Sequence, residues 1–159
     1  VGLAVADAVE VELNRSQVPP LDEARGGPAH VEGPGPRSLT CVVKRSALSG
    51  FYLLDELTGF DAAVVVDAVR TGAHPPGTVL SLPFASLRGE SGPSPHAAGL
   101  PTVIRLGRQS GVPLPERIHV VAVEVVDMES IAEGLTPAVA AAVPAARDAV
   151  LAALGDGRV

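Results

Sequence analysis

Two side chains in this sequence, Asp67 and His96, have the types and positions that suit metal recognition. Asp67 directly follows the apolar run 62–66, so it stands at the carboxyl end of a predicted strand, where ligand sites gather in open α/β sheets. His96 lies in a polar loop before a predicted helix, from which an imidazole can reach another strand end. A carboxylate and an imidazole suit nickel, zinc or iron, although these metals usually take three or more ligands. A turn cap for Asp67 and a structural role for His96 are open alternatives.

The other reactive residue types favour structural roles. His30, His74 and His119 occur in a loop, in a Pro-rich turn and at the outward face of a predicted strand. Glu124 is a charge inside a Val-rich strand, so it should face a polar edge or pair with a cation. Cys41 lies in an apolar run, which predicts a buried thiol. We find no nucleophile-elbow serine and no phosphate-binding glycine motif, so a Ser or Cys nucleophile and nucleotide binding have little support.

Composition limits the fold and the partners of this chain. The 159 residues are 47% apolar with a mean hydropathy of +0.32, which suits one domain over residues 1–159 with an aliphatic core. The net charge of −6 and the lack of a basic run argue against nucleic-acid binding. Because no apolar stretch approaches the roughly 18–20 residues of a membrane span and no signal sequence is visible, we expect a cytoplasmic protein.

Hydrophobic periodicity predicts the elements that would position Asp67 and His96. Residues 15–37 carry five Pro and four Gly and read as a long loop. The run 62–66 is the clearest candidate for a central strand, buried on both faces. The expected order of helices and strands along the chain implies an α/β fold. This fold would be a three-layer αβα sandwich with a central, mostly parallel sheet. The predicted helices are 1–13, 46–57, 100–106 and 137–154, and the predicted strands are 39–43, 62–66, 78–82 and 118–126.

Three segments resemble, in this order, the hydrogenase maturation endopeptidases. They are AVVVDAVRTGAHPPGTVLSL (63–82), SPHAAGL (94–100) and EGLTPAVAAAVPAARDAVLAAL (133–154). The resemblance implies a central sheet flanked by helices. It also implies an enzyme that removes a C-terminal extension from the large subunit of nickel-iron hydrogenase after nickel insertion. The family's metal-binding aspartate and histidine fall on Asp67 and His96.

The sequence departs from the family pattern in two places. The family has a further carboxylate ligand in a glycine-rich loop between its first strand and first helix, whereas this sequence begins inside that helix. We therefore expect a domain truncated at its N-terminus relative to the family. The family's Asp-Gly-Gly-Thr-x-Gly-like turn corresponds to residues 44–50, which keep Gly50 and introduce Lys44 and Arg45. These three residues are candidates for substrate binding, because the change alters charge and backbone freedom near the expected site.

The function implied by the resemblance is that of a metal-dependent endopeptidase whose partner is the hydrogenase large-subunit precursor. The nickel would be carried by that substrate, and Asp67 and His96 would complete its coordination, so that cleavage depends on metal loading. One rival is a non-catalytic metal- or protein-binding homologue of the family. A second is an α/β domain in which Asp67 is only a turn cap.

Overall fold

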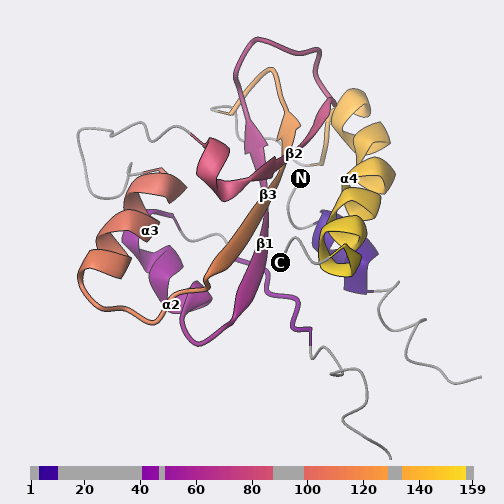
Figure 1. Ribbon diagram of the computed structural model, residues 1–159. Coiled ribbons are helices and arrows are strands. Elements are labelled where there is room, and N and C mark those ends of the chain that lie inside the picture. Colours follow the sequence, from indigo (N-terminus) through magenta and orange to yellow (C-terminus); the bar gives the residue numbers. More distant parts are fainter. Residues whose placement is uncertain (1–3, 11–40, 47–48, 88–98, 129–133, 157–159) are drawn as a thin grey trace, which may run out of the picture.

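Figure 1 shows a computed structural model of the chain, which describes residues 4–10, 41–46, 49–87, 99–128 and 134–156. Residues 4–10 form a helix. The predicted long loop 15–37 lies outside the described residues. The other elements are η1 (Gly50–Tyr52), α2 (Leu53–Leu57), β1 (Ala62–Val69), β2 (Val79–Pro83), η2 (Phe84–Ser86), α3 (Leu100–Gln109), β3 (Arg117–Glu124) and α4 (Pro137–Gly155).

The three strands form one mixed sheet in the order β1-β3-β2. β1 runs parallel to β3, with Asp67 opposite Ala122 and Val69 opposite Glu124. β2 runs antiparallel to β3. The α/β class is confirmed, but the described sheet is mixed rather than mostly parallel. The reason lies in residues 70–78, which join β1 to β2: a parallel crossover takes about a dozen residues or more, so this short connection reverses the chain.

The central strand of the described sheet is β3. All its residues after Arg117 are buried, whereas β1 is half-buried along its length and exposed at Asp67. The prediction that the run 62–66 is the central strand, buried on both faces, is therefore wrong. Both strands are Val-rich, and an apolar run alone does not reveal which strand has neighbours on both edges.

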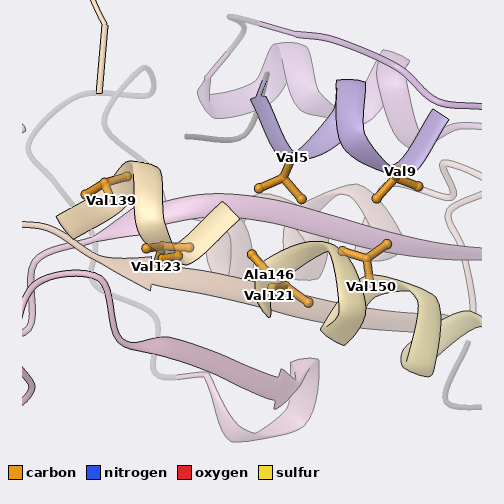
Figure 2. Packing of buried hydrophobic residues seen from close by; sticks show 8 residues of the cluster. Val5, Val9, Val121, Val123, Val139, Ala146 and Val150 are labelled. Carbon is orange, nitrogen blue, oxygen red and sulfur yellow. The ribbon is translucent and has the colours of Figure 1, made fainter. Parts of the chain in front are cut away.

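One face of the sheet packs against α4 and the helix at residues 4–10 (Figure 1). Figure 2 shows Val121 and Val123 of β3 meeting side chains from both helices. The predicted start of α4 is confirmed, since Pro137 is its first residue and Thr136 is its N-cap, although the Thr136 side chain makes no capping hydrogen bond. The buried cluster consists of Val5, Val9, Val121, Val123, Val139, Ala142, Ala146 and Val150.

By length and composition alone, α4 is long and apolar enough to cross a membrane, with a mean hydropathy of 1.5. It is not an uninterrupted apolar stretch, because Arg147 and Asp148 lie within it. Five of its residues are buried at intervals of three or four, including Ala142 and Ala146, and 28% of the apolar window is buried. That spacing is typical of a helix that covers a sheet with one stripe.

The helices α2 and α3 lie on the other side of the sheet in Figure 1. α3 confirms the predicted helix and buries Val103 and Ile104, and the left-handed Gly111 follows its end. Gly107 lets α3 approach α2, because a Cβ at this position would lie 2.7 Å from a methyl group of Leu54. Of the predicted helix 46–57, residues 50–57 form η1 and α2, whereas residues 46 and 49 are not helical.

The segment before η1 differs from its prediction. Residues 41–43 are not part of a strand, Cys41 is exposed and Val42 is 57% exposed. The predicted strand at 39–43 is wrong over these residues, and so is the predicted burial of the Cys41 thiol. A short apolar run becomes a strand only where a neighbouring strand pairs with it, which periodicity does not reveal.

Gly77 and Gly59 give a matched test of packing at the start of α4. Both have a left-handed backbone, with φ of +86° and +84°, but a Cβ on Gly77 would meet the carbonyl oxygen of Ala138 at 2.5 Å, while Gly59 has open space. We expect Gly59→Ala to cost about 1–2 kcal/mol for the backbone conformation. Gly77→Ala should cost a further 1–3 kcal/mol, roughly, for the clash. Urea unfolding measures both; equal losses would contradict the close approach.

Candidate functional site

Asp67 lies near the carboxyl end of β1, two residues before the strand ends at Val69. Its side chain is exposed, and its Oδ1 accepts a hydrogen bond of 2.8 Å from the backbone N–H of Ala68. This local bond resembles what a turn cap would make, but it occurs inside the strand. The carboxylate therefore has a defined orientation and remains open to solvent at the edge where we expected it.

The second predicted ligand, His96, lies outside the described residues, so its distance from Asp67 stays a prediction. The helix that it was expected to precede does begin nearby, at Leu100, with Gly99 as its N-cap. Over the described ranges, no group of three or more His, Cys, Asp or Glu side chains lies close enough to hold a metal ion.

The two cations of the 44–50 turn have carboxylate partners within the chain. Arg45 pairs with Asp7 and with Glu10 of the first helix, its Nε lying 2.8 Å from Asp7 Oδ1. These hydrogen bonds, that of Glu10 first, raise the pKa of the Arg45 guanidinium. The pairs tie residues 44–46 to the helix at 4–10, and substrate binding by Arg45 stays a prediction.

Lys44 makes a similar connection to α2. Its Nζ lies 2.9 Å from Glu56 Oε2 and donates a 3.0 Å hydrogen bond to the Glu56 carbonyl oxygen. It also lies 5.3 Å from the centre of the Phe60 ring. The third candidate of this turn, Gly50, is buried and has a φ of +59° at the start of η1. Substrate binding by Lys44 and Gly50 also stays a prediction.

Glu124, at the end of β3, has a role that the sequence did not reveal. It is only 1% exposed, and its carboxylate accepts hydrogen bonds from donors in the loop after β1. Oε1 accepts hydrogen bonds from the backbone N–H groups of Thr71 and Gly72, at 2.7 and 2.8 Å, and Oε2 accepts one from Thr71 Oγ1 at 2.6 Å. The Thr71 hydroxyl is the main cause that lowers the pKa of Glu124, followed by the two backbone groups, against the opposing effect of burial. The side chain is therefore an ionised carboxylate that fixes a loop.

His119 is buried, at 4% exposed, and does not face solvent as the strand pattern suggested. Its Nε2 lies 2.8 Å from Ser81 Oγ on the neighbouring strand β2. The sequence placed His119 on an outward face, but β3 is central, so both of its faces are covered. A structural role is the one the geometry supports.

A hollow of about 430 Å³ lies at the opposite end of the sheet, before β1 and β3 begin. Ligand sites in open α/β sheets gather at the carboxyl ends of parallel strands. Asp67 therefore marks the better candidate site, and this hollow does not include it. Its lining residues are Gly59, Phe60, Asp61, Pro113, Leu114, Glu116 and Arg117.

Comparison with known proteins decides the family. A family profile described as hydrogenase maturation protease (HycI) matches residues 47–153. The chain belongs to the hydrogenase maturation protease family. Among solved structures, it is similar to the hydrogenase maturating endopeptidase HybD from E. coli, with 30% identity over 69% of this chain and 67% of that one and a TM-score of 0.54. The comparison with curated proteins finds no match.

Membership of the hydrogenase maturation protease family confirms the resemblance drawn from three segments of the sequence. The matched range contains Asp67 and His96 and begins within the altered turn, after Lys44 and Arg45. Members of this family process hydrogenase large subunits, which links the family to nickel-dependent hydrogenase maturation.

The lowered pKa of Glu124 predicts how the stability of this protease homologue depends on pH. A carboxylate with a lower pKa in the folded state adds stability above its unfolded pKa, and that stability is lost as the pH falls through the folded pKa. Between about pH 7 and pH 3, the melting temperature of the parent should therefore fall more than that of Glu124→Gln, which lacks this titration. Thermal melts followed by circular dichroism measure the difference; parallel curves would contradict the assignment.

Proposed function

We propose that this chain is an endopeptidase that removes the C-terminal extension of a nickel-iron hydrogenase large-subunit precursor after nickel insertion. The observation that supports it most is the family match over residues 47–153, which includes an exposed carboxylate at the carboxyl end of β1. We also infer a cytoplasmic location and a three-layer αβα sandwich.

In the proposed mechanism the nickel belongs to the substrate, and Asp67 and His96 recognise it. An exposed carboxylate is accessible to a metal held by another protein, whereas a buried one would first have to be uncovered. Oxygen and imidazole ligands would engage Ni(II) in a loaded precursor and find nothing to bind in an empty one. Recognition of the metal would hold the precursor with its scissile bond near the strand end, which makes cleavage conditional on loading.

A non-catalytic homologue is the second candidate. It is favoured by the altered turn, where Arg45 and Lys44 bind Asp7, Glu10 and Glu56 of the chain itself. Such a protein would bind the nickel-loaded precursor without cutting it.

Cleavage of a nickel-loaded precursor tests the proposed function. We expect the parent chain to shorten the precursor, and Asp67→Asn or His96→Gln to lower the initial rate by about 100-fold or more, because loss of even an outer-shell partner of a metal costs 10- to 100-fold. Asp61→Asn is the matched control, since Asp61 precedes the same strand at its other end. Mass spectrometry of the products gives the rates and the cleavage position.

Three outcomes of this experiment separate the hypotheses. Processing by Asp67→Asn at the rate of the parent would remove Asp67 from the site. Equal cleavage of loaded and nickel-free precursors would contradict metal recognition. Binding of the loaded precursor by the parent chain without any cleavage would favour the non-catalytic homologue.

A further inference from the structure

The loop at residues 70–78 crosses the end of β3, where Glu124 binds both of its ends. It leaves β1, runs above the sheet in Figure 1 and enters β2. The carboxylate of Glu124 binds its beginning through Thr71 and Gly72. The backbone of Glu124 binds its end: its carbonyl oxygen accepts from Gly77 N–H at 2.8 Å, and its N–H donates to the Thr78 carbonyl oxygen at 2.9 Å. The beginning of the loop is therefore bound by the side chain of Glu124, and its end by the backbone of the same residue.

An ionised carboxylate suits this position better than any neutral side chain. Two N–H groups and one hydroxyl converge on it, and an ionised carboxylate only accepts hydrogen bonds. A glutamine would turn its own N–H groups toward one of these donors. Because burying a charge is costly, a buried Glu124 is expected only where its hydrogen bonds offset that cost.

Glu124 is linked to Asp67 through the end of β1 and the first residues of the loop. Glu124 stands opposite Val69 in the register of β1 and β3, and Val125 N–H donates to the Val69 carbonyl oxygen at 2.8 Å. Asp67 lies two residues before Val69, and the carboxylate of Glu124 binds Thr71, two residues after it. Two sets of contacts thus hold the end of β1 that carries Asp67. They are the backbone pairing with β3 and the loop that Glu124 binds where the strand ends.

We propose that Glu124 is a positioning residue for the candidate nickel-recognition edge, which acts through Thr71 and Gly72 to fix the backbone that carries Asp67. This inference rests on the proposed function for its consequence in catalysis. Sites for metals and scissile bonds tolerate little displacement, so release of the loop should affect turnover even though Glu124 itself touches no substrate.

The hydrogen bond from Ala68 N–H to Asp67 Oδ1 provides a reporter that needs no catalysis. Exchange of the Ala68 amide with solvent depends on how the Asp67 carboxylate is held. We expect Glu124→Gln and Thr71→Val to speed exchange of this amide by about tenfold, through local opening of the strand end. The amides of α4 should keep the rate of the parent. Exchange followed by NMR on the full 159-residue chain measures each site.

Two further variants separate positioning from general stability. Thr71→Ser keeps the hydroxyl that binds Glu124 and should restore slow exchange, in contrast to Thr71→Val. Val150→Ala weakens the core between α4 and the sheet without touching the loop. In this variant, exchange of the Ala68 amide should speed up no more than exchange of the α4 amides.

Cleavage of the nickel-loaded precursor gives the second measurement. For Glu124→Gln and Thr71→Val we expect kcat/KM for the loaded precursor to fall by about tenfold or more, because displacement of Asp67 weakens both recognition of the metal and placement of the scissile bond. Thr71→Ser should cleave like the parent.

Exchange of the Ala68 amide tests the positioning role of Glu124 independently of catalysis. Exchange at Ala68 at the parent rate in both Glu124→Gln and Thr71→Val would overturn the proposal, and so would equal acceleration of all amides. If the parent chain cleaves nothing, the proposed function fails, whereas faster exchange confined to the end of β1 would still support positioning by Glu124.

Discussion

The described structure depends on the complete enclosure of the strand β3. It has a neighbouring strand on each edge, and its residues from Ile118 to Glu124 are buried. Polar side chains on such a strand have to find partners inside the protein, because unpaired buried polar groups are costly. His119 meets the hydroxyl of Ser81, and Glu124 meets Thr71 and Gly72. Enclosure thus explains both polar contacts.

The short connection between β1 and β2 fixes the edge of the sheet that carries Asp67. Because residues 70–78 are too few for a parallel crossover, they pass directly over the end of β3 and return antiparallel. The route brings the loop within reach of Glu124 and presses Gly77 against the first turn of α4. The edge that carries Asp67 is therefore tied to both the sheet and a helix.

The sequence predicted the elements that have long periodic patterns and clear boundaries. Pro137 and Gly111 marked the start of α4 and the end of α3, and the Val-rich run marked β3. The predicted strand 39–43 failed at residues 41–43, because strand formation there depends on a neighbour, which no local pattern encodes. The central strand was misidentified for the same reason. The partners of Glu124 lie 52 and 53 residues away in sequence, so its contacts could not be predicted from spacing.

The two carboxylates near this edge show how environment divides roles between similar groups. Asp67 was predicted because it follows an apolar strand, and the structure leaves it exposed, with one local bond to Ala68. A carboxylate offers about four lone-pair positions, so Asp67 keeps capacity for an external partner. Glu124 uses three of its positions on the loop and is buried. It could reach a metal on another protein only by releasing that loop, so its chemistry favours support and that of Asp67 favours recognition.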